Sequence, residues 1–118
     1  MKDKQKLVAQ VKDFIKWAKP QLGIDIPVKV NLVPVKKTIN GQFSFGSFNP
    51  NNNEIIVAYK DRHILDILRS LSHEMVHLHQ NLLGKLKDDS GNTGSNIENE
   101  ANSFAGVLMR NWTKQDNS

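Results

Sequence analysis

Residues 61–83, DRHILDILRSLSHEMVHLHQNLL, decide the fold because their apolar side chains recur at the spacing of an α-helix. Side chains three and four positions apart lie on one side of a helix, since one turn takes about 3.6 residues. Six of them form a continuous apolar stripe: Ile64, Leu68, Leu71, Met75, Leu78 and Leu82. Gly84 follows, and glycine is common just after a helix end. The segment is therefore predicted to be an amphipathic helix that packs on the core.

The same helix carries the pattern H-E-x-x-H at residues 73–77. His73 and His77 are one helical turn apart, so both imidazoles can reach one metal ion. Glu74 would lie beside a water molecule on that ion, where a general base is needed. On a helical wheel both histidines lie opposite the apolar stripe. They are expected to line a cleft, with an ordinary solvated helix face as the alternative.

The histidine pair is incomplete because a catalytic zinc ion needs three protein ligands and one open position. The chain has no cysteine and no histidine after His79, so a carboxylate of the last predicted helix is expected to complete the site. Ser95 and Glu98 match a capping box, in which both side chains satisfy free backbone donors of the first helical turn. That role for Glu98 leaves Glu100 as the predicted third ligand.

A calcium-binding loop is the competing interpretation of Glu100. Counted from Asp89, Gly94 is sixth and Glu100 is twelfth, as in an EF-hand loop. Gly91 at the third position offers no side-chain ligand, and Thr93 is a poor fifth one. Zinc is therefore favoured over calcium.

The remaining pattern predicts an α+β fold with the motif-bearing helix near its centre. Apolar periodicity predicts the helices, and β-branched or aromatic runs between turn residues predict the strands. The second and third strands are expected to pair as a hairpin. In chain order the prediction is a helix at residues 3–19, strands at 27–35, 42–48 and 54–60, the helix at 61–83, a polar loop at 85–96 and a helix at 96–112.

Length and charge limit the classes of function. A chain of 118 residues is predicted to form one domain, residues 1–118, without a separate substrate domain. The net charge is +4, and lysines crowd into the first predicted helix: Lys2, Lys4, Lys6, Lys12, Lys16 and Lys19. They are interpreted as a solvated helix face, with nucleic-acid binding as a weaker alternative. No apolar run has the length of a membrane span and no signal peptide is recognised, so a cytoplasmic protein without a membrane partner is expected.

The chain resembles the small zinc metallopeptidases of the gluzincin type. The resemblance is carried by residues 73–77 (HEMVH) and by residues 100–105 (EANSFA), which look like the E-A-[ND]-x-F-A signature of the ImmA/IrrE-type peptidases. Length and element order are similar to those of minimal gluzincins, and short proteins of this kind occur in bacteriophages. The resemblance implies a minimal zincin-like fold, a protein or peptide substrate, Zn2+ bound by His73, His77 and Glu100, and Glu74 as the catalytic base.

The implied reaction is hydrolysis of a peptide bond by water activated on zinc, with Glu74 moving the proton to the leaving amine. In such families the edge strand of a small sheet binds the substrate backbone, and the predicted strand at 42–48 is the candidate here. Larger gluzincins add a histidine or tyrosine after the third ligand to stabilise the oxyanion, and this chain has neither beyond Glu100. The candidates for that role are Tyr59, His63, His79 and Arg110.

A second class of function is a non-catalytic binding or structural module, such as a phage or regulatory protein that keeps the zincin scaffold. Glu74 distinguishes the two classes. A purely structural zinc ion has no use for a base beside an open position and tends towards four closed ligands.

Overall fold

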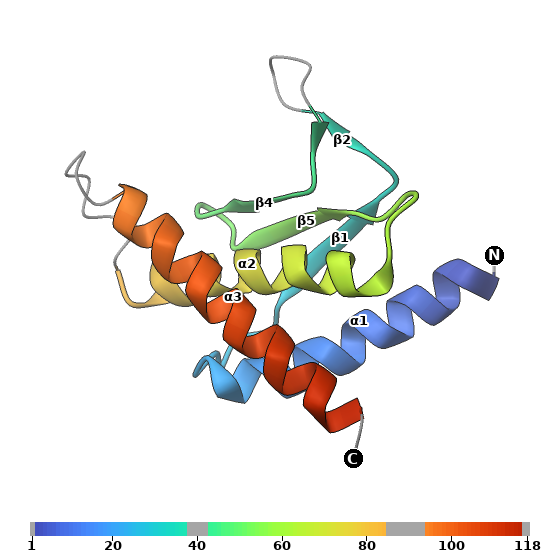
Figure 1. The fold of residues 1–118 in the computed structure, drawn as a ribbon. Helices are drawn as coiled ribbons and strands as arrows, with labels where there is room; N and C mark the ends of the chain where they lie inside the picture. The colour runs from blue at the N-terminus through green and yellow to red at the C-terminus, as the bar shows by residue number, and fades with distance from the viewer. Residues whose placement is uncertain (1, 38–42, 85–93, 117–118) are drawn as a thin grey trace.

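The computed structural model describes residues 2–37, 43–84 and 94–116 (Figure 1). The predicted α+β class is confirmed, with an N-terminal helix, a small three-stranded sheet, the helix that carries residues 73–77, and a C-terminal helix. Residues 85–93 lie outside the described part, and with them most of the predicted polar loop and of the calcium-loop pattern. The elements are α1 (Lys2–Gln21), β1 (Lys29–Val33), β2 (Lys36–Lys37), β3 (Phe43–Ser44), β4 (Gly46–Asn49), β5 (Glu54–Ala58), α2 (Ile64–Leu82) and α3 (Gly94–Asp116).

The three-stranded sheet has the order β1-β5-β4. β4 and β5 form the predicted antiparallel hairpin, with Gly46 opposite Val57 and Asn49 opposite Glu54. β1 pairs with the other side of β5 in the parallel direction, with Lys29 opposite Glu54. β4 is therefore one of the two outer strands of this sheet.

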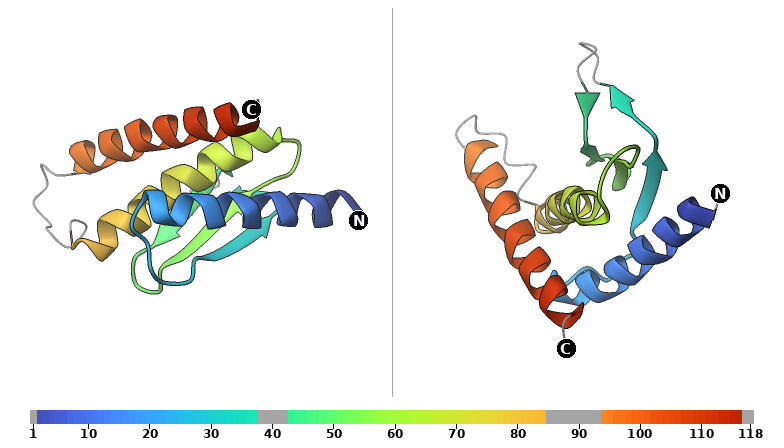
Figure 2. Two further views of the ribbon diagram at one scale, coloured as in Figure 1. Left: turned by 90° about the horizontal axis from the view of Figure 1, so that it is seen from below. Right: turned by 45° about the vertical axis from the view of Figure 1, so that its right-hand side comes forward.

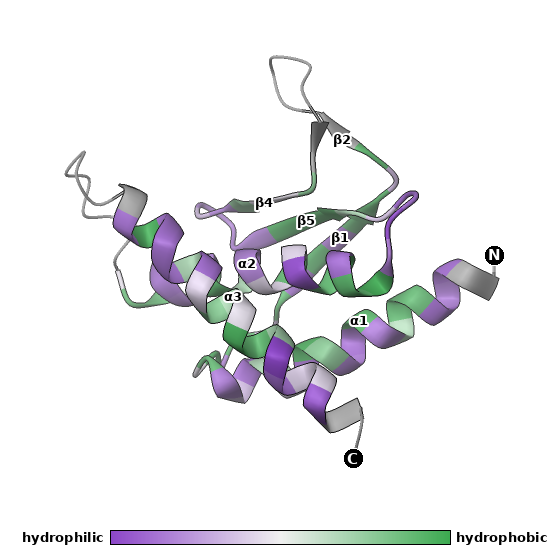
Figure 3. Ribbon diagram, viewed as in Figure 1, coloured by the Kyte–Doolittle hydropathy of each residue, from purple (hydrophilic) through white to green (hydrophobic). Residues whose placement is uncertain are grey.

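All three helices lie on one side of the three-stranded sheet (Figures 1 and 2). α2 lies directly beneath β4 and β5, and α3 crosses α2 on the side away from the sheet (Figure 1). The buried side chains of β5, Ile55 and Val57, are fully covered, as are Leu71, Met75 and Leu78 of α2. Figure 3 shows hydrophobic residues along β1 and β5, next to the helices. Within the described ranges, no helix combines the length and the apolar character needed to cross a bilayer.

The helices also meet in a small aromatic cluster that joins the two ends of the chain. The ring centroids of Phe14 and Trp17 on α1 lie 5.2 Å and 5.4 Å from that of Trp112 on α3. Phe14 is fully buried. Edge-to-face and tilted ring pairs of this kind add to the stability gained from burying the rings. α1 and α3 are thereby fixed to one another beneath α2.

The predicted strand at 42–48 is divided in two, because Phe45 interrupts it. β3 pairs with β2, whereas β4 pairs with β5. The carbonyl oxygen of Phe45 accepts a hydrogen bond from the backbone N–H of Ala58 at 3.0 Å. Its ring lies on the guanidinium of Arg62, 4.5 Å from ring centroid to Cζ, and remains largely exposed.

Arg62 ties this bend to the beginning of α2. Nη1 donates to the carbonyl oxygen of Ala58 at 2.7 Å and to that of Phe45 at 3.4 Å. Nη2 donates to the carbonyl oxygen of Asp66 at 2.9 Å and to Oγ of Ser70 at 2.6 Å. The planar, five-donor guanidinium is suited to such forked contacts. Arg62 thus holds the end of β5, the start of β4 and the first turns of α2 together.

We expect Arg62→Lys to lower the free energy of unfolding by about 1–3 kcal/mol, because a single ammonium group cannot serve acceptors on both sides. Urea denaturation of the purified protein measures the change. Arg69→Lys on the exposed side of the same helix is the matched control, with an expected change within about 0.5 kcal/mol. Equal losses in the two variants would contradict the role given to Arg62.

Candidate metal centre

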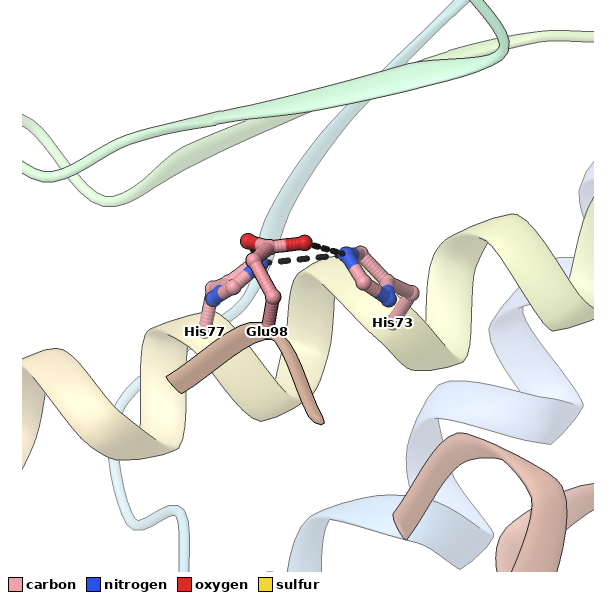
Figure 4. A group of neighbouring side chains, drawn as sticks. All are labelled: His73, His77 and Glu98. Carbon is pink, nitrogen blue, oxygen red and sulfur yellow. Dashed lines mark hydrogen bonds and ion pairs between the residues drawn. The ribbon is translucent and has the colours of Figure 1, made fainter. Parts of the chain in front are cut away.

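The residues of the H-E-x-x-H pattern lie where α2 is enclosed by two neighbours. β4 passes above this part of α2, and α3 passes beside it (Figures 1 and 4). Glu74 and His77 are therefore buried, at 8% and 9% exposure, while His73 is half-buried. The face opposite the apolar stripe is not a plain solvated surface. It forms the floor of a site between a sheet edge and a helix.

Three ligand atoms converge on this floor (Figure 4). Nε2 of His73 lies 3.1 Å from Nε2 of His77. The carboxylate of Glu98 reaches from α3 to both rings, with Oε1 2.9 Å from Nε2 of His77 and Oε2 3.3 Å from Nε2 of His73. The ligand atoms offered by these three residues all lie within 4.8 Å of one another.

The structure brings Glu98, and not Glu100, to the two histidines. The capping box predicted that Glu98 would be engaged with the backbone of its own helix. Instead α3 begins at Gly94, and the carboxylate of Glu98 extends to α2. Glu100 accepts a hydrogen bond from Nε2 of Gln80 at 2.8 Å. This geometry favours Glu98 over the predicted Glu100 as the carboxylate nearest the two histidines, and the identity of the third ligand stays a prediction.

The donor set fits a zinc ion. Two imidazoles and one carboxylate are three ligands of the kind that catalytic zinc sites use, leaving one coordination position for water. The two Nε2 atoms face one another at 3.1 Å, so at most one of them can carry a hydrogen atom along that line. A lone pair on the other nitrogen and the oxygens of Glu98 are then directed at the same small volume. A cation placed there would satisfy all three groups at once.

His73 has the protonation properties of a metal ligand. Burial, followed by the neighbouring His77, lowers its pKa below the ordinary value, and this outweighs the opposing effect of Glu98. The side chain of Asn102, one turn after Glu98 on α3, is hydrogen-bonded to the ring of His73. A neutral imidazole held by an outer hydrogen bond is the form that binds a metal.

Glu74 is next to the ligands but faces the sheet. A Cβ atom added to Gly46, the first residue of β4, would lie 3.3 Å from Oε2 of Glu74 and 3.4 Å from its Cγ. The strand can approach the carboxyl group this closely because residue 46 has no side chain. Burial, and secondly the charge of Glu98, raise the pKa of Glu74 from 4.5 to about 7. A carboxyl group with this pKa can both accept and release a proton near neutral pH.

The sequence proposes four side chains for stabilising the oxyanion: Tyr59, His63, His79 and Arg110. Tyr59 packs against the core, and the ammonium group of Lys4 lies 5.7 Å from its ring centroid. His63 caps α2, its Nδ1 accepting from the backbone N–H of Leu65 at 3.0 Å. It precedes His73 by ten residues, which corresponds to about 15 Å along a helix.

The other two candidates lie on or beside α3. The ring of His79 packs against that of Phe104 at 6.4 Å between centroids. Arg110 follows Glu98 by twelve residues, about 18 Å along the helix, and lines a separate shallow pocket with Asp66 and Arg69. Each of the four thus has its contacts outside the group formed by His73, His77 and Glu98. Asn102 is the polar side chain beside the histidines that sequence reasoning missed, although its position four residues after Glu98 places both on one helix face.

Comparison with known proteins adds no relative: no family model matches the chain, and no curated protein or solved structure matches it. The case for a function therefore rests on the residues and their geometry.

The burial of Glu74 predicts a pH dependence of stability in the metal-free protein. Since its pKa is about 7 in the folded state and near 4.5 in the unfolded chain, the folded state keeps a proton that the unfolded state releases. The contribution of Glu74 to stability is therefore expected to fall as pH rises from about 4.5 to 7 and then to level off, whereas the lowered pKa of His73 gives that ring a contribution that rises with pH. Glu74→Gln removes this titration. At pH 8 it should raise the free energy of unfolding by on the order of 2 kcal/mol relative to the wild-type protein.

Urea denaturation in the presence of a chelator, at pH 5 and pH 8, measures this effect. The stability difference between Glu74→Gln and wild type should be larger at pH 8 than at pH 5. A difference that is the same at both pH values would show that Glu74 is not protonated preferentially in the folded state.

Proposed function

We propose that this protein is a zinc-dependent peptidase, with His73, His77 and Glu98 as the metal ligands and Glu74 as the general base. The observation that carries the proposal is the convergence of two imidazoles and a carboxylate directly beside a buried glutamate whose pKa is about 7. The gluzincin resemblance agrees with this combination, with Glu98 taking the place first given to Glu100.

The role of the metal follows from its general chemistry. A zinc ion held by these three residues would lower the pKa of a bound water molecule towards neutrality and polarise the carbonyl group under attack. Glu74 supplies the proton transfer: its carboxylate accepts a proton from the attacking water and returns it to the leaving amine. Without a metal ion its pKa is raised to about 7, and a carboxyl group that titrates near neutral pH is suited to both steps.

The sheet offers a place for a peptide substrate. β4 is an outer strand, and its first residue packs over Glu74. An extended peptide added to the outer edge of β4 would therefore run past the base, with main-chain hydrogen bonds supplying affinity. This makes an unfolded segment or an extended loop of a protein the favoured class of substrate.

A non-catalytic zinc-binding module is the second candidate. It is favoured by the positions of Tyr59, His63, His79 and Arg110, each of which has its contacts elsewhere. If none of these four donates to the developing oxyanion, then among the described residues its stabilisation falls to the metal and to the amide of Asn102, which lies beside His73. The two candidates differ in activity but share the metal centre.

We expect the purified protein to bind one zinc ion per chain, and Glu98→Ala to weaken zinc binding by more than the roughly 10- to 100-fold that removing an outer hydrogen-bond partner costs. Competition with a chromophoric chelator measures the affinity. Asn99→Ala, at the exposed neighbouring position of α3, is the matched control and should leave affinity unchanged. If Glu98→Ala binds zinc as tightly as Asn99→Ala does, Glu98 is not a ligand.

Glu74→Gln separates the catalytic candidate from the non-catalytic one. The variant should keep zinc but lose cleavage of an unfolded, fluorescently labelled protein by roughly 100- to 10,000-fold, the usual contribution of a general base. Product release is followed by fluorescence and by mass spectrometry. Equal rates in wild type and variant, or no metal-dependent cleavage in either, would exclude the peptidase and leave the binding module.

A further inference from the structure

Gln80 is a fully buried polar residue beside the candidate metal centre. It lies on α2, three residues after His77, with 0% exposure. A primary amide at this depth must satisfy both its oxygen and its nitrogen to avoid a penalty of about 1–3 kcal/mol for each group left unpaired. Its hydrogen-bond partners therefore identify which end of the amide is the oxygen and which is the nitrogen.

The partners on α3 fix the orientation of this amide. One end lies 3.0 Å from the carbonyl oxygen of Ile97, which can only accept a hydrogen bond, so this end is the Nε2 donor. The same nitrogen donates to Oε1 of Glu100 at 2.8 Å. The other end, Oε1, lies 2.8 Å from Nδ1 of His77. Because Oε1 can only accept, Nδ1 of His77 is the donor and carries a hydrogen atom.

The ring of His77 is held by that orientation. Its other nitrogen, Nε2, faces Nε2 of His73 at 3.1 Å and Oε1 of Glu98 at 2.9 Å. With hydrogen fixed on Nδ1, Nε2 is the nitrogen that can exchange its contact with Glu98 for a metal ion. We propose that Gln80 and Glu100 act as a positioning pair, which holds the ring of His77 through its Nδ1–H so that Nε2 is the nitrogen directed into the metal centre.

The same contacts set the position of the third ligand. Ile97 and Glu100 lie on either side of Glu98 in the first turns of α3, and both hold the amide of Gln80. One side chain of α2 therefore aligns this part of α3 with the ring of His77. Glu100 acts through Gln80 and does not itself contact the metal in this arrangement. This inference rests on the proposed function, because the position of the His77 ring matters in this way only if His77 binds a metal ion.

The experiment measures the tautomer without metal and the affinity with it. In metal-free protein at pH 8, two-bond 1H–15N spectra distinguish protonated from unprotonated ring nitrogens of His77. The wild-type ring should carry hydrogen on Nδ1. Gln80→Met removes the acceptor at similar volume, so hydrogen should be lost at least partly from Nδ1. Zinc affinity, measured by chelator competition, should fall roughly 10- to 100-fold.

A swapped double variant tests rescue. In Gln80→Glu with Glu100→Gln, a carboxylate oxygen again accepts from Nδ1 of His77 and the amide at position 100 can donate to that carboxylate, although the carbonyl oxygen of Ile97 loses its donor. This variant should restore the Nδ1–H tautomer and bind zinc more tightly than Gln80→Met does. Gln21→Met, at an exposed position at the end of α1, is the control for the substitution itself and should match the wild type in both measurements.

Each outcome either supports or overturns the proposed role of Gln80 and Glu100. A wild-type His77 without hydrogen on Nδ1 overturns the proposal, and so does a folded Gln80→Met with unchanged hydrogen on Nδ1 and unchanged zinc affinity. If Gln80→Met does not fold, the swapped variant decides: hydrogen on Nδ1 supports the positioning pair, and its absence from Nδ1 contradicts it. If the wild-type protein binds no zinc, the proposed function fails, while the metal-free spectra still show whether Gln80 sets the tautomer.

Discussion

The packing of α3 across α2 is the interaction on which the candidate metal centre depends. Ala101 and Ala105 are buried on the side of α3 that meets α2, and their small side chains let the two helices approach closely. Further along the contact, Oγ of Ser72 lies 3.6 Å from the sulfur of Met109. This approach lets the short carboxylate of Glu98 span the gap to both histidines. A larger residue at position 101 would hold the two helices further apart and so separate Glu98 from the histidines.

The local elements could be read from the sequence because their signals are local. The apolar stripe of α2, the strand-forming runs of β1 and β5 and the turn residues between β4 and β5 each act over a few neighbours, and the structure confirms those elements. Leu82 is an exception, because it is exposed at the end of the helix. The division of the predicted strand at Phe45 was also missed, since it depends on Arg62, which lies seventeen residues further along the chain.

The candidate site was predictable only in part, for a related reason. His73, Glu74 and His77 are neighbours on one helix, so their spacing determines how they face. The choice between Glu98 and Glu100 depends on how α3 is rotated against α2, and no local pattern encodes that rotation. Ser95 and Glu98 match a capping box, but the carboxylate of Glu98 contacts the two imidazoles of α2 instead. Gln80 has no motif of its own, and only its burial and partners reveal it.

The metal-free centre concentrates groups that oppose one another. Two imidazoles and the carboxyl groups of Glu74 and Glu98 lie close together, with Glu74 buried and Glu98 exposed. The burial of Glu74 and the charge of Glu98 raise the pKa of Glu74 and so disfavour its charged form. Such an arrangement lowers stability unless a cation or protons are present. The residues of the candidate site therefore lower the stability of the fold, to which the aromatic cluster of Phe14, Trp17 and Trp112 contributes.

The parallel pairing of β1 with β5 has a consequence for how the chain is made. β1 ends at Val33, but its partner is complete only at Ala58, after the hairpin of β4 and β5. During synthesis from the N-terminus, α1 and β1 leave the ribosome before β5 does. Their apolar surface therefore stays exposed until the hairpin has been made. Exposed lysines of α1, Lys4, Lys6, Lys12 and Lys16, place like charges on that segment, and mutual repulsion of this kind keeps nascent chains apart.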